Sequence, residues 1–240
     1  MRELKKAAIV TGATRGIGKA IAIRLACLDY QVVGVYKSSD KLAKDLEKQY
    51  KNISTIKANI ADEEDVLKVI KKTVDEFGQI DVVVNNVGID LFGEIETYDT
   101  KKWDIMVNTN LKSIFLFSKY SITYLKKSEN PVIINISSRI GFPEFTESKF
   151  VVYGMVKAGV TNFSIGLSKE LASFGIRVNV VIPTPTKTDL FDEVFTKEEE
   201  KELIKKNKLG KPNEVADLVL QLINDKSANG KILIDKRVYL

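Results

Sequence analysis

The chain has 240 residues, a net charge of +5, one cysteine (Cys27) and no histidine. This length is enough to bury a core in one α/β domain, while the cysteine and histidine counts exclude an internal disulfide framework and argue against a structural zinc site. Because no apolar stretch approaches the length of a membrane span, we expect a cytoplasmic protein with no membrane anchor and no metal ligands.

Short apolar runs rich in β-branched residues alternate with longer segments whose apolar residues recur every three or four positions. The short runs predict buried strands, and the longer segments predict helices. This alternation is typical of a doubly wound parallel sheet, here one α/β domain over residues 1–240. We expect an insertion at about residues 186–210 to form a mobile helical flap. The predicted strands are 7–11, 31–36, 53–58, 81–86, 131–137, 176–183 and 231–235, and the predicted helices are 17–29, 41–50, 63–77, about 101–127, about 149–174 and 213–225.

A glycine-rich segment, TGATRGIG, joins the first predicted strand to the first predicted helix. Gly12, Gly16 and Gly18 allow a tight turn and a close approach of the backbone to a ligand. The helix that follows offers free N–H groups and the positive end of its dipole to a pyrophosphate. An ordinary strand-to-helix turn is the alternative, but the position of the motif favours a dinucleotide site.

The end of the second predicted strand indicates which dinucleotide binds. A carboxylate there would select an unphosphorylated ribose, but the chain has Tyr36, Lys37 and Ser38 before the first acid, Asp40. Arg15 lies within the glycine turn. Two cations and hydroxyl groups suit a 2′-phosphate, so NADP (NADPH) is favoured over NAD. The alternative is that both cations are ordinary surface bases.

Two Tyr-x-x-x-Lys pairs occur, Tyr98–Lys102 and Tyr153–Lys157. About one such pair is expected by chance in a chain this rich in lysine, so spacing alone does not identify a functional pair. Without histidine, the chain lacks the side chain most often used for proton transfer near neutral pH. A tyrosine assisted by a lysine is a candidate for that role.

Five motifs in fixed order resemble the short-chain dehydrogenase/reductases, in the single-domain NADP-type branch that includes 3-oxoacyl-[acyl-carrier-protein] reductases. They are TGATRGIG, NNVG at residues 85–88, VNTNLKS, NISS and YGMVK. The resemblance implies a Rossmann fold and hydride transfer between a nicotinamide and a carbonyl or alcohol. It also selects Tyr153, which follows the fifth strand and its serine, over Tyr98.

The resemblance further implies four catalytic residues. Tyr153 is expected to be the general acid or base, and Lys157 to lower its pKa and hold the nicotinamide ribose. Ser138 is expected to polarise the carbonyl, and Asn110 to anchor a water that links the lysine to solvent. For Ser138 and Asn110, a strand-end hydroxyl and a polar helix residue are the alternatives.

Cofactor contacts are carried over in the same way, and three departures from the family pattern lie close to them. Asn59 stands where the family often has Asp, Val87 stands where Ala is usual, and Thr184-Pro185 follows Pro183 where Gly is usual. The expected cofactor-binding residues are Gly12, Thr14, Arg15, Gly16, Ile17, Gly18, Tyr36, Lys37, Ser38, Asn59, Ile60, Asn86, Val87, Gly88, Tyr153, Lys157, Pro183, Thr186 and Thr188.

The substrate stays open between a 3-oxoacyl thioester and a small ketone, alcohol or sugar. An NADP-binding redox sensor with little or no turnover is the alternative function. The resemblance implies a homo-oligomer, a dimer or tetramer that pairs the long helices at about 101–127 and 149–174. The lysines are scattered among acids rather than gathered in a stripe, so nucleic acid is not an expected partner.

Overall fold

Seven strands form one sheet in this computed structural model, which describes residues 5–239. The strand order is β3-β2-β1-β4-β5-β6-β7, and each neighbouring pair runs parallel. The predicted doubly wound fold is therefore confirmed, with a strand in each predicted segment. The strands are β1 (Ala7–Thr11), β2 (Gln31–Tyr36), β3 (Ile53–Lys57), β4 (Val82–Asn85), β5 (Val132–Ile136), β6 (Arg177–Ile182) and β7 (Ile232–Ile234).

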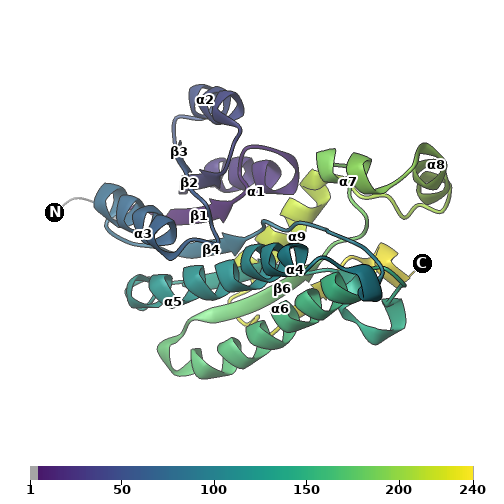
Figure 1. Cartoon of the computed structure of the whole chain (residues 1–240). Helices are drawn as coiled ribbons and strands as arrows, with labels where there is room; N and C mark the ends of the chain where they lie inside the picture. Colours follow the sequence, from purple (N-terminus) through teal and green to yellow (C-terminus); the bar gives the residue numbers. More distant parts are fainter. Residues whose placement is uncertain (1–4, 240) are drawn as a thin grey trace.

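Helices cover both faces of the sheet (Figure 1). The core residues place α1 and α9 against one face and α3, α5 and α6 against the other. The helix predicted at about 101–127 is divided, because a π-helical turn at Asn108–Lys112 separates α4 from α5. The helices are α1 (Gly16–Ala26), α2 (Asp40–Gln49), α3 (Glu63–Phe77), α4 (Thr100–Val107), α5 (Ser113–Leu125), α6 (Val151–Glu170), α7 (Asp189–Val194), α8 (Lys197–Lys205) and α9 (Pro212–Asn224).

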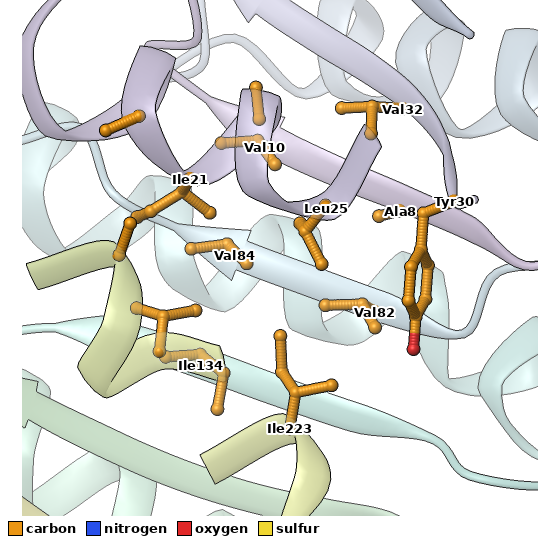
Figure 2. Close-up of a cluster of buried hydrophobic side chains, with 14 of the residues drawn as sticks. Ala8, Val10, Ile21, Leu25, Tyr30, Val32, Val82, Val84, Ile134 and Ile223 are labelled. Atoms are coloured by element: carbon orange, nitrogen blue, oxygen red, sulfur yellow. The ribbon is translucent and has the colours of Figure 1, made fainter. Parts of the chain in front are cut away.

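Alternate residues of the central strands enter two separate apolar cores. Ala8 and Val10 of β1 share one core with Ile21 and Leu25 of α1, as Figure 2 shows. Ile9, between them, belongs to the core under α3, α5 and α6. Because both faces of the sheet are buried, its strands are continuous apolar runs instead of alternating apolar and polar residues.

The strand order reverses at β1, which has β2 on one side and β4 on the other. In a doubly wound sheet the loops that leave such strands diverge to opposite faces and create a crevice at the carboxyl ends. The glycine turn follows β1, NNVG spans the end of β4, and Ser138 follows β5. The three motifs therefore meet at one edge of the sheet.

Between β6 and α9 the chain forms the two short helices α7 and α8. The insertion expected at about 186–210 is thus partly helical, while its mobility stays a prediction. Within residues 5–239, no helix is long and apolar enough to cross a membrane. Over the same range, no three His, Cys, Asp or Glu side chains form a group that could hold a metal ion.

Candidate active site

The glycine turn after β1 is built to let a ligand approach the backbone. Gly12 and Gly16 have positive φ angles of 70° and 53°, which side chains rarely tolerate. A Cβ on Gly18 would lie 2.2 Å from the carbonyl oxygen of Gly12, so only glycine fits there. Arg15 caps α1 without a side-chain hydrogen bond to the first turn. The first N–H groups of α1 therefore suit the pyrophosphate of a dinucleotide.

The end of β2 favours a phosphorylated ribose for a reason that the sequence did not reveal. The carboxylate of Asp40 accepts hydrogen bonds from the Tyr36 hydroxyl (3.1 Å) and the Lys57 ammonium (3.0 Å). The first acid after β2 is thus already engaged. Lys37 is exposed beside it, and Arg15, also exposed, forms a weak ion pair with Asp189 at 3.4 Å.

Asn86 ties the end of β4 to the glycine turn. Its backbone N–H donates to Thr11 Oγ1 (2.9 Å), and its side-chain Nδ2 donates to the carbonyl oxygen of Thr11 (2.8 Å). A Cβ on Gly12 would lie 2.9 Å from Val87 Cγ2, so the valine that replaces the usual alanine packs directly on the turn. Across the crevice, the methyl carbon of Thr188 would lie 3.1 Å from a Cβ on Gly16.

The other predicted cofactor residues differ in how far their side chains are exposed. Thr14, Ile60 and Thr186 are buried, and the Thr186 hydroxyl donates to the carbonyl oxygen of Thr184 (2.8 Å). Asn59 is exposed after β3, and its Oδ1 accepts a long hydrogen bond from the N–H of Ala61 (3.4 Å). Ser38 is exposed, whereas Ile17 and Pro183 are partly buried.

Tyr153, Lys157 and Ser138 come together where α6 passes the end of β5. Lys157 is 3% exposed, and its Nζ donates to the carbonyl oxygen of Ile136 at 3.2 Å. The same Nζ lies 5.6 Å from the centre of the Tyr153 ring. Ser138 makes a hydrogen bond with the Tyr153 hydroxyl, and Ser138 Oγ also accepts one from the N–H of Ile140 (3.3 Å).

The expectation that Lys157 and the charge of oxidised nicotinamide together lower the pKa of Tyr153 stays a prediction, because it concerns the protein with its cofactor bound. The pKa of Tyr153 is raised above its usual value, chiefly by burial and further by the negative charge of Asp90, while the hydrogen bond with Ser138 acts in the opposite direction. Burial lowers the pKa of Lys157 to about 8, and the charge of Asp90 opposes this shift. Tyr153 thus keeps its proton at neutral pH, as a general acid must.

Asn110 lies in the π-helical turn between α4 and α5 and is fully buried. Its Oδ1 accepts from the N–H of Ile89 (3.0 Å), and its Nδ2 donates to the carbonyl oxygens of Ile89 (3.1 Å) and Met106 (3.0 Å). The side chain of Asn110 therefore holds the loop after β4 against α4. π-Helical turns within α-helices are frequent at functional sites. A Cβ on Gly88 would lie 3.1 Å from both Asn110 Oδ1 and Lys157 Nζ, so glycine allows these groups to converge.

A 3₁₀ turn at Arg139–Gly141 holds Ser138 against α6. A Cβ on Gly141 would lie 2.7 Å from the backbone nitrogen of Ala158, and one on Gly154 would lie 2.9 Å from the carbonyl oxygen of Ile140. The two glycines therefore let the turn and the helix touch backbone to backbone. This contact sets how close Ser138 comes to Tyr153.

Motif comparison missed two features of the site. Asn85 Nδ2 donates to Asn135 Oδ1 (2.8 Å), and Asn135 Nδ2 donates to Ser164 Oγ (2.8 Å), so a buried chain of hydrogen bonds joins β4, β5 and α6. The second feature is Asp90, whose pKa burial raises to about 6 against the lowering effect of Lys157. An acid two residues beyond NNVG was the available signal for it.

Thr184-Pro185 gives the loop after β6 a definite path. The Thr184 hydroxyl donates to the carbonyl oxygen of Lys208 (2.6 Å), and backbone hydrogen bonds join Pro185 and Lys187 to Gly210 (2.7 and 3.0 Å). A cavity of about 220 Å³ lies beside this loop. Its walls are Arg139, Thr184, Pro185, Phe195, Glu199, Glu202, Leu203, Lys206, Lys208, Arg237 and Val238.

The sequence matches the family model described as short chain dehydrogenase over residues 6–199. It is 33% identical over 233 residues to the 3-oxoacyl-[acyl-carrier-protein] reductase FabG of Thermotoga maritima, covering 95% of this chain and 94% of that protein. It is 35% identical over 225 residues to the 3-oxoacyl-[acyl-carrier-protein] reductase of Synechocystis, covering 92% and 90%.

Solved structures agree with the sequence matches. A short chain dehydrogenase from Burkholderia cenocepacia in complex with NADP has a TM-score of 0.88 at 28% identity, over 96% of each chain. The structure described as ElxO with NADP bound has a TM-score of 0.86 at 30% identity, also over 96% of each chain. The similarity therefore extends over nearly the whole chain and is not confined to the motifs.

Proposed function

The chain belongs to the short-chain dehydrogenase/reductase family, and on that premise we propose that it uses NADPH to reduce the carbonyl group of a 3-oxoacyl thioester. The observation that supports this most directly is the meeting of Tyr153, Lys157 and Ser138 at the end of β5. Relatives named as 3-oxoacyl-[acyl-carrier-protein] reductases align with more than nine-tenths of the chain, which favours this substrate class over a free sugar or alcohol.

The cofactor has matching groups along the crevice. The first turn of α1 would hold the pyrophosphate, and Arg15 with Lys37 would hold the 2′-phosphate. Because Lys57 and Tyr36 already engage the carboxylate of Asp40, that acid is a poor acceptor for an unphosphorylated ribose. The chain is therefore assigned NADP in preference to NAD.

When bound, the dinucleotide supplies the hydride, and the side chains of the chain handle the proton. Ser138 donates a hydrogen bond to the substrate carbonyl oxygen and polarises it. Tyr153, which keeps its proton at neutral pH, gives that proton to the oxygen as negative charge develops. The ammonium of Lys157 then stabilises the phenolate. This division of labour explains how the chain can act without histidine.

The substrate side also fits an acyl thioester. Arg139, which follows Ser138 in the chain, lines the cavity beside the Thr184-Pro185 loop. Four basic and two acidic side chains line it (Arg139, Lys206, Lys208, Arg237, Glu199 and Glu202). Three of the basic side chains are paired with acids, since Arg139 pairs with Glu147, Lys206 with Glu202, and Arg237 with Asp235 and Glu214. Lys208 forms no ion pair among the described residues, so its ammonium would be the group to contact the phosphate-bearing arm of an acyl carrier.

A homo-oligomer is part of the proposal. Large apolar side chains are exposed on the helices that carry the site: Trp103 and Ile105 on α4, Phe115 on α5, and Val151 and Met155 on α6. Figure 1 shows these helices on the same face of the sheet. Contact with a second copy of the chain would cover this surface.

The test compares NADPH oxidation by the wild type and Tyr153→Phe with acetoacetyl-CoA and a panel of small ketones. Loss of the general acid should reduce kcat about 10²–10⁴-fold, while NADPH binding, measured by fluorescence, is retained. Lys102→Met, in the other Tyr-x-x-x-Lys pair and exposed on α4, should keep most of the turnover. NADPH binding without turnover on any substrate would instead favour the redox sensor.

A further inference from the structure

Asp90 lies in the loop after β4, and its charge has no role in the reaction described above. The residue is partly exposed. Its Oδ1, however, is buried and has no hydrogen-bond partner among residues 5–239. A buried carboxylate oxygen without a donor is costly unless a positive charge compensates it. The position of Asp90 therefore needs an explanation in the charges around it.

Hydrogen bonds fix the backbone on both sides of Asp90. Asn110 holds both backbone polar groups of Ile89, at 3.0 and 3.1 Å. On the other side, the Tyr98 hydroxyl donates to the carbonyl oxygen of Leu91. Because both neighbours of Asp90 are fixed to segments that flank α4, the backbone that carries the buried carboxyl oxygen has a set position in the site.

The loop closes over the buried ammonium of Lys157. A Cβ on Gly88, two residues before Asp90, would lie 3.1 Å from Lys157 Nζ. The titratable groups that face Asp90 among the described residues are Tyr98 from the segment before α4, and Tyr153 and Lys157 from α6. The positive charge in this set is that of Lys157, which is 3% exposed and donates to the carbonyl oxygen of Ile136.

We propose that Asp90 is the counter-charge of the buried Lys157 ammonium, a positioning residue that sets the pH range over which Lys157 and Tyr153 keep their protons. The kinetic part of this inference rests on the proposed function. The electrostatic part does not, because it concerns two groups of the protein alone.

The directions of the pKa shifts agree with this role. Burial raises the pKa of Asp90 to about 6, and burial lowers that of Lys157 to about 8, while each charge opposes the shift of the other. Both groups are therefore ionised between about pH 6 and pH 8. Without the carboxylate, the pKa values of Lys157 and Tyr153 should both fall, because ammonium loses a stabilising charge and phenolate loses a repelling one.

The first test is the pH profile of kcat/KM for carbonyl reduction in Asp90→Asn, which keeps the shape of the side chain. We expect the alkaline limb to move down by about one pH unit. Activity would then fall roughly five-fold relative to wild type at pH 8 and stay close to it below pH 6. Asp90→Glu should restore the limb. Glu94→Gln, which removes an exposed charge paired with Lys149 at 3.7 Å, should leave the profile unchanged.

The second test needs no turnover. The carboxyl ¹³C signal of Asp90, assigned by its loss in Asp90→Asn, should titrate near pH 6 in the wild type. In Lys157→Met, its midpoint should rise by about one pH unit, because the positive charge that favours the carboxylate is gone. Lys157→Gln serves in the same way if the methionine variant does not fold.

The outcomes separate this inference from the proposed function. The counter-charge proposal is overturned if the titration midpoint of Asp90 does not change when Lys157 loses its charge. It is also overturned if kcat/KM of Asp90→Asn falls by the same factor at every pH. If the midpoint moves but no carbonyl compound is reduced, the counter-charge stands and the proposed reaction falls.

Discussion

Replacing Gly141 with alanine should push Ser138 away from Tyr153, because the added methyl group meets the backbone of α6. Its Cβ would lie 2.7 Å from the nitrogen of Ala158 and 2.8 Å from the carbonyl carbon of Lys157. Carbon atoms pack favourably at about 3.5 Å, so the 3₁₀ turn or the helix must retreat by roughly 0.7 Å. Helix backbone cannot rotate away as a flexible side chain can.

Overpacking of this kind costs about 1–3 kcal/mol. In a chain of this length, each kcal/mol lowers the Tm by about 2–4 °C, so we expect a loss of roughly 2–12 °C. Displacement of a catalytic group by up to 1 Å reduces turnover by as much as about 10²-fold. The KM for NADPH should change little, because the glycine turn after β1 is not part of this contact. Thermal unfolding and steady-state kinetics measure both effects.

Gly166→Ala is the matched control, since it adds the same methyl group to α6, the helix that Gly141 faces. Among the described residues, no atom outside the adjoining helix backbone lies within 4 Å of a Cβ at Gly166. Alanine should therefore stabilise α6 by up to about 1 kcal/mol and leave turnover unchanged. The reasoning fails if Gly141→Ala unfolds at the wild-type temperature and turns over at the wild-type rate.

Three further predictions concern the cofactor, the loop after β6 and the assembly. Arg15→Ala and Lys37→Ala should each raise the KM for NADPH about tenfold and leave the KM for NADH nearly unchanged, because each removes one charge-assisted phosphate contact; equal effects on both cofactors would contradict this. A Cβ on Gly210 would lie 2.7 Å from Thr184 Cγ2, so Gly210→Ala should lower the Tm, and Thr184→Ser should rescue it by removing that methyl group while keeping the hydroxyl. Phe115→Glu on α5 should yield a smaller species in analytical ultracentrifugation, whereas an unchanged sedimentation coefficient would place the oligomer contact elsewhere.

The fold could be predicted from the sequence because its strands are buried on both faces. Ile9 packs toward α3, α5 and α6, and its neighbours Ala8 and Val10 pack toward α1 and α9. A run such as AAIVT thus has to be apolar at every position, and this pattern is visible without coordinates. The glycine turn could also be predicted, since Gly12, Gly16 and Gly18 each meet a conformational or steric requirement.

The electrostatics of the site could not be predicted, because they depend on burial and on contacts between distant segments. The helical spacing of Tyr153 and Lys157 is local, but the pKa of Tyr153 responds to Asp90, which approaches from another loop. The π-helical turn that buries Asn110 has no signature in the apolar pattern of residues 101–127. The sequence also does not show that Lys57, on β3, donates a hydrogen bond to the carboxylate of Asp40.

Four phenylalanine side chains near the carboxyl ends of the strands differ in what they contact. Phe142 and Phe145 pack against the apolar residues of β6 and β7 and so belong to the core at that edge. Phe150 instead lies beside Tyr153, with ring centres 6.5 Å apart, and beside Phe92, at 5.8 Å. Phe150 and its neighbour Phe92 therefore form an aromatic pair next to Tyr153.

The loop between Ser138 and Tyr153 helps to hold that aromatic pair. Lys149 adopts a left-handed conformation, with φ of 67°, and its carbonyl oxygen accepts a hydrogen bond from the N–H of Gly93 (3.0 Å). This hydrogen bond thus joins the loop after β4 to the residues before α6, where Phe92 lies beside Phe150. Tyr153 and Lys157 are held by α6, while the aromatic pair beside them depends on the loop between Ser138 and Tyr153. A change in that loop should accordingly alter the choice of substrate before it alters the chemistry at Tyr153.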